Sequence, residues 1–503
     1  MFFQPPTTRL SPVFFFLSSR LPPLPADDVK GRGWGPNNAI ERNQITVWQT
    51  KRRGDEGLHW AGSCMVLKEG GGSAGQAMEQ QTGRLYEFVV FGATGYAGRF
   101  VVEKLAQVLE KETSTVYRWA VAGRSRERLL KVVSRLPCKL GKPKPSVGTI
   151  VCDVNDPDSV EKMCKQTLLL MNCVGPYWLL GEPVVKACIK NGTNYIDICG
   201  EPKFLEEMYM KYNKEAAENG VHVVGSSGFS SIPADMGVIY TQNEVDGIIT
   251  TIESFWYPKL TGKGIGINRT AWQAAIHGLQ FKHHLKKLRK QTSLEPIPFM
   301  DKTVKRNVHY CKEYNYVAIP FIGADASVVR RTQRYLYEHH QKTPVHYVSY
   351  SVVSGFVSAL LLLFAGFLIT LLAKIKCGRR LLLKYPDFFS CSAFSDEGPT
   401  QRGIKETSFQ MRFISKGYSM DKDPVYDIPN MVAYTSVEGP EPAYVTTSIA
   451  MVQAAVTMIE EQKLLPKGGG VFTPGAAFAQ TSLLDRLTES GLTFSVQKTT
   501  TKD

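Results

Sequence analysis

The stretch from Phe88 to Gly98 constrains the fold of this chain more than any other. It reads Phe-Val-Val-Phe-Gly-Ala-Thr-Gly-Tyr-Ala-Gly, and apolar residues at helical spacing follow it. This pattern predicts a strand, a tight turn and a helix. Gly92 permits a sharp turn, Gly95 permits the close approach of a pyrophosphate, and Gly98 lets the helix pack closely on the strand. The spacing is G-x-x-G-x-x-G, so we predict a dinucleotide-binding turn; a purely structural glycine turn is the alternative. The residues assigned to this turn are Gly92, Ala93, Thr94, Gly95, Tyr96, Ala97 and Gly98.

Strand-like and helix-like segments alternate from about residue 84 to residue 235. The expected strands after the first are rich in apolar residues and span residues 119–123, 149–153, 168–174, 194–198 and 221–224. The expected helices between them span residues 126–136, 159–166 and 183–191. Apolar strands that alternate with helices imply a parallel sheet covered on both faces. We therefore predict an α/β fold in which residues 84–235 form a Rossmann doubly wound domain.

The residues after the second expected strand indicate which dinucleotide binds. A site that prefers NAD carries an acidic residue there, for the ribose 2′-hydroxyl. This chain has Gly123, Arg124, Ser125 and Arg126 instead. The helix dipole disfavours positive charge at a helix start, and the 2′-phosphate of NADP would supply a compensating anion. NADP is therefore the expected cofactor and NAD is less favoured, with solvated surface arginines as the alternative. Asp153, the last residue of the third expected strand, either reaches the adenine ring or caps the segment that follows.

The segment after the fourth expected strand is predicted to lie beside the nicotinamide. It reads Asn172-Cys-Val-Gly-Pro-Tyr177, and ligands bind at the carboxyl ends of parallel strands. Asn172, Gly175 and Pro176 are assigned to the cofactor site because glycine and proline suit a close approach of the backbone. Tyr177 is a weak catalytic candidate if it faces the substrate, and packing against the cofactor is the alternative.

Six motifs together resemble those of the saccharopine dehydrogenase-like oxidoreductases. They are the glycine turn, Ala122-Gly-Arg-Ser125, Asn172 to Tyr177, Tyr195-Ile-Asp-Ile-Cys-Gly-Glu201, Gly225-Ser-Ser-Gly-Phe-Ser-Ser-Ile-Pro-Ala-Asp-Met-Gly237 and Gly469-Gly-Val-Phe-Thr-Pro-Gly-Ala-Ala477. The resemblance runs from about Met78 to the end of the chain and extends to a vertebrate member of the family that carries a hydrophobic insertion. It implies an NAD(P)-binding Rossmann domain, a second α+β domain and a substrate that the family does not fix.

One residue departs from the family pattern. The family's loop usually reads Gly-Phe-Asp-Ser-Ile-Pro, whereas Ser230 stands here in the place of the aspartate. If that carboxylate orients a substrate, this chain has lost it. Asp235 is then a weak catalytic candidate that keeps part of the role, and capping of a helix that starts near Met236 is the alternative.

The remaining chain divides by composition and by the resemblance. Residues 1–83 contain proline and glycine clusters that break every periodicity, so we predict a disordered extension. Met78 is the favoured working start, and a targeting peptide with a short apolar region is the alternative. Within residues 236–440, the segments 250–256 and 408–414 alternate in polarity like antiparallel strands, which indicates an α+β domain. We expect this domain to supply the substrate wall and the oligomer contact, with a homodimer as one arrangement. For residues 441–503 the resemblance implies helices and a strand that return to the Rossmann domain.

A hydrophobic segment, residues 345–373, lies within the second domain. No Asp, Glu, Lys or Arg occurs in it, and basic residues follow at positions 374, 376, 379, 380 and 384. Its length suffices to cross a bilayer. Crossing would separate parts of the fold, so we favour residues 345–384 embedding in one leaflet or in a lipid-droplet monolayer. A helix buried in an oligomer interface is the alternative.

Composition excludes several classes of function. The net charge is +14, but the basic residues are scattered and accompany no nucleic-acid-binding motif, so we expect no nucleic-acid partner. The ten cysteines include no C-x-x-C pair, and we expect no metal. Free thiols in apolar runs are typical of a reducing, intracellular compartment.

Two functions remain. The first is an NADP-dependent oxidoreductase that moves hydride to or from a carbonyl- or imine-like carbon at a membrane or lipid-droplet surface. The second is a catalytically idle, cofactor-binding scaffold on the same surface, because no acid/base pair is identifiable. The surface of lipid droplets is the expected location, with the mitochondrion as the alternative. A short-chain dehydrogenase is disfavoured because its Tyr-x-x-x-Lys pair occurs only at Tyr418 and Lys422, outside the Rossmann domain.

Overall fold

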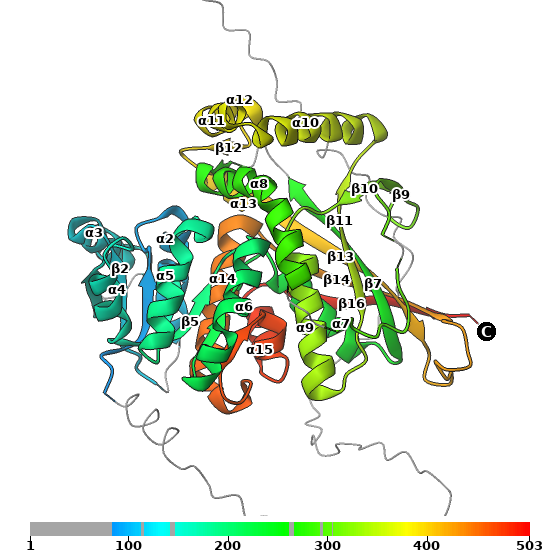
Figure 1. Ribbon diagram of the computed structural model, residues 1–503, viewed down its shortest axis with the longest axis horizontal. Helices are drawn as coiled ribbons and strands as arrows, with labels where there is room; N and C mark the ends of the chain where they lie inside the picture. The colour runs from blue at the N-terminus through cyan, green and yellow to red at the C-terminus, as the bar shows by residue number, and fades with distance from the viewer. Residues whose placement is uncertain are drawn as a thin grey trace, which may run out of the picture.

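The computed structural model describes residues 83–111, 115–140, 146–260, 266–291, 295–303 and 305–502. The predicted disordered extension lies outside these residues, except for Gly83. The described chain builds two seven-stranded sheets that lie beside each other, with a helical layer above them (Figure 1).

The first sheet confirms the predicted Rossmann-type arrangement. Its strands are all parallel and lie in the order β15-β6-β5-β4-β1-β2-β3. They span Tyr86–Phe91 (β1), Trp119–Gly123 (β2), Val147–Val151 (β3), Thr167–Asn172 (β4), Asn194–Asp197 (β5), His222–Val224 (β6) and Gly470–Phe472 (β15). The order reverses between β1 and β4, and the crevice beside such a reversal is where doubly wound sheets bind ligands.

Helices cover both faces of this sheet because its strands are apolar on both sides. Phe88 and Val90 face one core, and Val89 and Phe91 face the other. The first core is closed by α2 (Tyr96–Lys111), α3 (Arg126–Leu140) and α14 (Thr447–Glu460), and the second by α4 (Pro157–Cys164), α5 (Tyr177–Lys190) and α6 (Pro202–Glu218).

The C-terminal residues split between the two sheets. β15 joins the parallel sheet beside β6, and α14 packs against α2, as the resemblance implies. The final strand, β16 (Thr493–Thr501), instead pairs antiparallel with β14 (Met431–Pro440) of the second sheet. The prediction that this strand returns to the Rossmann domain is therefore wrong. Its polar, mostly exposed residues suit an antiparallel edge and not a strand buried on both faces.

The second sheet has the order β16-β14-β13-β7-β11-β10-β9. Its remaining strands are β7 (Ile248–Leu260), β9 (His309–Cys311), β10 (Tyr316–Pro320), β11 (His346–Val353) and β13 (Thr407–Tyr418). The predicted strands at 250–256 and 408–414 lie in β7 and β13 and pair antiparallel, as expected. Helices α7 (Ile232–Glu244) and α9 (Asp325–His340) cover this sheet.

The hydrophobic segment consists of a strand followed by a helix. Residues up to Val353 form β11, and the helix α10 spans Phe356–Lys374 after a break at Gly355, whose φ is +81°. The strand reads His-Tyr-Val-Ser-Tyr-Ser-Val-Val, and its aromatic and β-branched residues favour a strand. α10 lies across the top of the molecule on α8 (Arg269–Gln291), followed by α11 (Lys376–Lys384) and α12 (Pro386–Phe389) (Figure 1).

Candidate cofactor site

The glycine turn joins β1 to α2 through contacts that leave no room for side chains. Gly92 has a φ of +85°, which favours glycine, and its carbonyl oxygen accepts a hydrogen bond from the Gly95 N–H at 2.9 Å. A Cβ atom at Gly98 would lie 2.2 Å from the Gly92 oxygen. The first turn of α2 contains no acidic residue, so its free N–H groups suit an anion.

The side chain of Asn172 holds the loop that follows β4. Its Oδ1 accepts a hydrogen bond from the Val174 N–H, and its Nδ2 donates to the hydroxyl of Tyr195, both at 3.0 Å. Gly175 and Pro176 continue this loop directly beside the strand-order reversal. Asn172 is fully buried, so in this structure its side chain shapes the loop.

Tyr177 is buried at the start of α5. Its hydroxyl donates to the carbonyl oxygen of Asn172 at 2.8 Å and accepts a hydrogen bond from the Ile198 N–H. Burial raises the pKa of this hydroxyl well above its ordinary value. The hydroxyl therefore faces the protein interior in this structure, and the ring packs against that of Phe204 on α6 at 5.8 Å.

Asp235 lies inside the first turn of α7, which begins at Ile232 and not near Met236. Its Oδ2 accepts hydrogen bonds from the Gly475 N–H at 2.7 Å and from the Thr332 hydroxyl at 2.8 Å. The carboxylate therefore holds α15 (Pro474–Phe478) and α9 against α7. It is fully buried, and this burial raises its pKa to about 6.

We expect Asp235→Asn to reduce the dependence of stability on pH. Asp235 has a pKa of about 6 in the folded chain against an ordinary 3.8, so the folded state binds the proton more tightly. Below its ordinary pKa the carboxyl does not lower the free energy of unfolding. This free energy falls as pH rises from 3.8 to about 6, where the folded chain also loses the proton. The shift corresponds to about 3 kcal/mol of unfolding free energy, which urea unfolding at about pH 4 and about pH 7 would measure.

Asp246 supplies the control for this experiment because it is exposed. Asp246→Asn should leave the difference between the two pH values as it is in the unchanged chain. The same difference in Asp235→Asn would contradict the expected result.

Two acidic residues of the site are not assigned by the sequence. Asp197 accepts hydrogen bonds from the Tyr195 hydroxyl and from the N–H groups of Cys199 and Ser226, and burial raises its pKa to about 6. Glu201 accepts from the first two N–H groups of α5 at 3.0 and 2.9 Å. Both lie in the Tyr195–Glu201 motif, but their partners are separated from them in sequence by up to 29 residues. No local pattern reveals such contacts.

The residues predicted to bind the adenosine half lie at the ends of β2 and β3. Arg124 is exposed, and its side chain has no hydrogen-bond or ion-pair partner within the described ranges. Gly123 is buried at the end of β2 and Ser125 is half-buried before α3. Asp153 accepts hydrogen bonds from the N–H and the side-chain amide of Asn155, whereas the N-cap of α4 is Asp156. Its carboxylate thus stabilises the turn before α4.

The carboxyl edge of the parallel sheet lies beneath the layer that carries α10. The Tyr96 hydroxyl, at the start of α2, donates to the carbonyl oxygen of Pro399 at 2.9 Å. At the start of α5, the ring of Trp178 lies 4.7 Å from that of His277 on α8. The segment after α12 and the helix α8 therefore both cover the candidate cofactor site.

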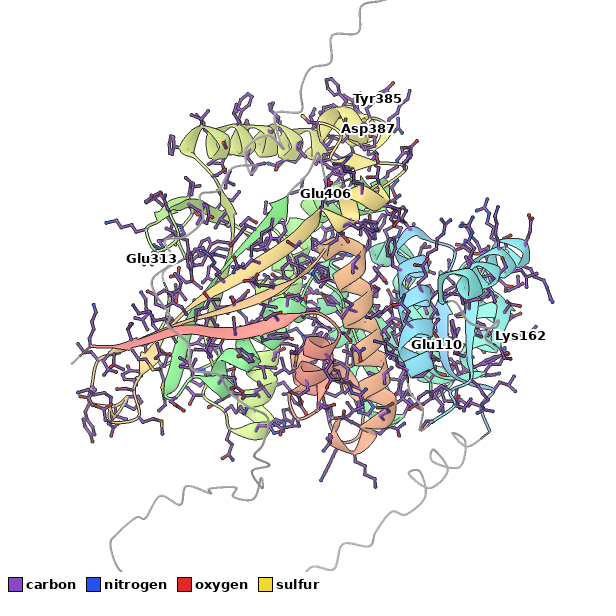
Figure 2. All side chains as sticks on the ribbon, turned by 180° about the vertical axis from the view of Figure 1, so that it is seen from behind. Glu110, Lys162, Glu313, Tyr385, Asp387 and Glu406 are labelled. Atoms are coloured by element: carbon purple, nitrogen blue, oxygen red, sulfur yellow. The ribbon has the colours of Figure 1, made fainter. Side chains whose placement is uncertain are left out.

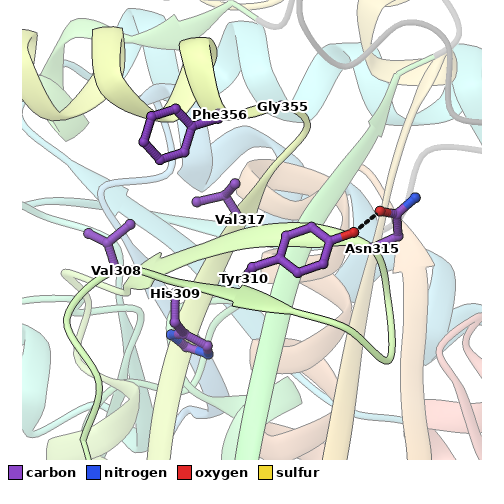
Figure 3. A pocket seen from close by; sticks show the side chains of 7 residues that line it. All are labelled: Val308, His309, Tyr310, Asn315, Val317, Gly355 and Phe356. Carbon is purple, nitrogen blue, oxygen red and sulfur yellow. Dashed lines mark hydrogen bonds between the residues drawn. The ribbon is translucent and has the colours of Figure 1, made fainter.

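A cavity of about 520 Å³ lies away from the cofactor residues, between the β9–β10 hairpin and the start of α10 (Figure 3). Its lining residues are Val308, His309, Tyr310, Asn315, Val317, Gly355 and Phe356. None of the residues assigned to the dinucleotide lines it. In the described residues, no group of three or more His, Cys, Asp or Glu side chains is arranged to hold a metal ion.

Comparison with known proteins finds the following similarities. Residues 88–224 match the family model of the saccharopine dehydrogenase NADP binding domain. A saccharopine dehydrogenase-like oxidoreductase of Bos taurus is 49% identical over 83% of this chain and 98% of its own. A lipid droplet localized protein of Caenorhabditis elegans is 37% identical over 82% of this chain and 98% of its own. Apo saccharopine dehydrogenase (L-Glu forming) of Saccharomyces cerevisiae aligns in structure over 82% of this chain and 100% of its own, with 10% identity and a TM-score of 0.47.

Proposed function

Because the chain belongs to the family of saccharopine dehydrogenase-like oxidoreductases, we propose that it is an NADP-dependent oxidoreductase that works at a lipid surface. The proposed reaction moves a hydride between the nicotinamide and a carbonyl- or imine-like carbon of a lipid-soluble substrate. The observation that carries the proposal is the turn from Gly92 to Gly98, where the start of α2 packs closely on the backbone of Gly92 and its first turn contains no acidic residue.

The chain's own residues would bind and orient the cofactor. The N–H groups at the start of α2 bind the pyrophosphate, and Arg124 binds the 2′-phosphate. The loop from Asn172 to Pro176, fixed by the buried Tyr195 and Asp197, orients the nicotinamide ring. When bound, NADPH supplies the hydride. The segment around Pro399 covers the turn and limits access of water to the site.

Lipid docking is supported by the path of the chain around α10. β11 before the helix and β13 after it both pair with β7, on its two sides. One crossing of a bilayer by α10 would place these two strands on opposite sides of the membrane, which their pairing with the same strand forbids. α11 is a short basic helix that could not return the chain through hydrocarbon. An orientation of α10 parallel to the lipid surface satisfies both constraints.

The surface of α10 is apolar around most of its circumference. Only 17% of the most apolar stretch of α10 is buried within the chain. The corresponding share is 83% for the other long apolar helix, Pro442–Glu460. The latter is therefore a core helix, whereas α10 needs a cover. The relative from Caenorhabditis elegans is named for its location on lipid droplets, which supports a lipid cover.

We expect Arg124→Ala to weaken NADPH binding and to leave NADH binding unchanged. Loss of a charge-assisted contact to the 2′-phosphate costs about 1.5 to 3 kcal/mol, which is roughly tenfold to a hundredfold in Kd. Quenching of tryptophan fluorescence during titration with each nucleotide measures the two affinities. Arg128→Ala is the control, since Arg128 is exposed on α3, the helix that follows Arg124. Equal weakening of both nucleotides would contradict the proposed role of Arg124.

The test of the proposed function is NADPH binding followed by NADPH oxidation with a panel of long-chain aldehydes, ketones and imines. Oxidation that depends on one of these compounds supports an oxidoreductase. Tight binding of NADPH without oxidation across the panel would favour the scaffold, and absence of binding would contradict both functions.

A further inference from the structure

We propose that the chain selects anionic phospholipid surfaces through a cationic rim beside α10. The rim is defined by Lys374, Lys376, Arg380 and Lys384. This inference rests on the proposed docking of α10 on lipid and names the chemistry of the surface to which it docks. The ligand class is the phosphate-bearing headgroup of an acidic phospholipid.

Charge is strongly biased in the segment that carries the proposed docking helix. Residues 355–395 contain five lysines and arginines and a single acidic residue, Asp387. Figure 2 shows Tyr385 and Asp387 together at the outer end of the molecule, beyond the second sheet. Because α10 itself contributes one cation, at its last residue, the positive charge gathers at one end of the apolar helix.

The cations of the rim share one stripe of α11. Lys376, Arg380 and Lys384 are spaced by four residues, so they lie along the same side of the helix, and all three are exposed. The opposite side packs inward through the buried Leu382, whose carbonyl oxygen accepts a hydrogen bond from the Trp272 indole. This contact fixes α11 with its cationic stripe outward.

The rim has no acidic partners in the described part of the chain. Lys374, Lys376, Arg380 and Lys384 form no ion pair there, and the one ring contact is Lys384 over Tyr385 at 5.2 Å. Arg379 differs, because its guanidinium donates to the carbonyl oxygens of Ala373 and Lys374 and caps the end of α10. Four cations are therefore free to bind an anion that the described chain does not supply.

Apolar and aromatic side chains border the rim and identify the anion as a lipid. Phe364 and Phe367 of α10 are 61% and 64% exposed, and Phe388 of α12 is 77% exposed. A nucleic acid or an acidic protein could pair with the cations but would leave these side chains in water. An anionic phospholipid surface would cover the aromatic side chains and pair with the cations at the same time. Hydrocarbon would lie over α10, and phosphates would lie at the level of Tyr385 and the rim.

The experiment is flotation of the full-length chain with vesicles of two compositions. One is phosphatidylcholine alone, and the other contains about one third phosphatidylserine. We expect the unchanged chain, with four rim cations, to bind the anionic vesicles at a lipid concentration roughly several hundredfold lower, and added salt should reduce this preference because it screens the charges. Arg380→Gln/Lys384→Gln should reduce the preference by roughly twentyfold to thirtyfold, since each cation near such a surface contributes about fivefold.

Lys463→Gln/Lys467→Gln is the matched control. It removes two exposed cations that follow α14. This end of α14 lies far from α10, because its Glu460 accepts a hydrogen bond from Tyr117, which precedes β2 at the opposite edge of the parallel sheet. The control should keep the full preference, and thermal melting verifies that both variants remain folded. Equal binding of the unchanged chain to both vesicles, or equal loss in both variants, would overturn the anionic selectivity and leave lipid docking standing. Failure to bind either vesicle would overturn docking and this inference together.

Discussion

Replacement of Gly98 by alanine should raise the Kd of NADPH by roughly tenfold to a hundredfold. The added Cβ would lie 2.2 Å from the carbonyl oxygen of Gly92 and 2.9 Å from its carbonyl carbon. Both are backbone atoms, so no side chain can rotate to relieve the contact. The Gly92 oxygen also accepts the hydrogen bond from Gly95 that closes the turn. Movement of α2 away from β1 would therefore open the turn and displace the N–H groups proposed to bind the pyrophosphate.

The measurement is titration with NADPH, followed by tryptophan fluorescence, with urea unfolding to separate lost affinity from lost stability. Gly278→Ala is the control because a Cβ at that position on α8 meets no atom within 4 Å. Alanine there should leave NADPH binding unchanged and improve helix propensity slightly. Unchanged affinity in Gly98→Ala would show that the turn is a structural one and that the dinucleotide, if bound, lies elsewhere.

The parts of the fold that are predictable are those fixed by neighbours in sequence. The turn after β1 follows from three glycines within seven residues, and the parallel sheet follows from apolar strands that alternate with helices. The pairing of β7 with β13 agrees with the alternation of their residues, although about 150 residues separate them. For the parallel sheet the local pattern is also the pattern of burial, whereas β7 is buried at every residue from Ile249 to Phe255.

The parts that are not predictable depend on contacts between distant residues. The resemblance places the last strand in the Rossmann domain, whereas β16 pairs with β14 of the second sheet. This pairing depends on which sheet offers a free edge that accepts a polar strand. Tyr177 is a catalytic candidate by sequence because it follows a strand end, whereas the direction of its hydroxyl is set by Asn172 and Ile198. The roles of Asp197 and Glu201 depend on loops that only the completed fold brings together.

The candidate site thus consists of two kinds of residue. Those proposed to touch the cofactor lie on the turn and at strand ends, where sequence indicates them. Those that hold these loops in place are carboxylates, the buried Asp197 and Asp235 and the half-buried Glu201, and each accepts hydrogen bonds from backbone N–H groups. Because their partners come from separate segments, a change at any of them would alter the shape of the site without touching the cofactor.

The second large effect concerns the lipid surface. Phe364→Asp/Phe367→Asp should abolish flotation of the chain with phospholipid vesicles. An aspartate at the centre of a membrane helix costs roughly 3 kcal/mol, and even half of this at each position gives about a hundredfold loss of binding. Both phenylalanines are more than half exposed, so the unfolding free energy should change by only about 0.5 kcal/mol. NADPH affinity should also remain unchanged, because neither residue belongs to the candidate cofactor site.

Val425→Asp/Ile428→Asp is the matched control, since these residues are 76% and 82% exposed in the connection between β13 and β14, away from α10. It should keep full binding to vesicles. Light scattering of the same samples addresses the competing explanation of the apolar helix. If α10 instead joins two copies of the chain, the unchanged protein would be a dimer without lipid, and Phe364→Asp/Phe367→Asp would be a monomer. If α10 docks on lipid, the vesicle-bound fraction of the chain should fall with this substitution, because the two aspartates would have to enter hydrocarbon.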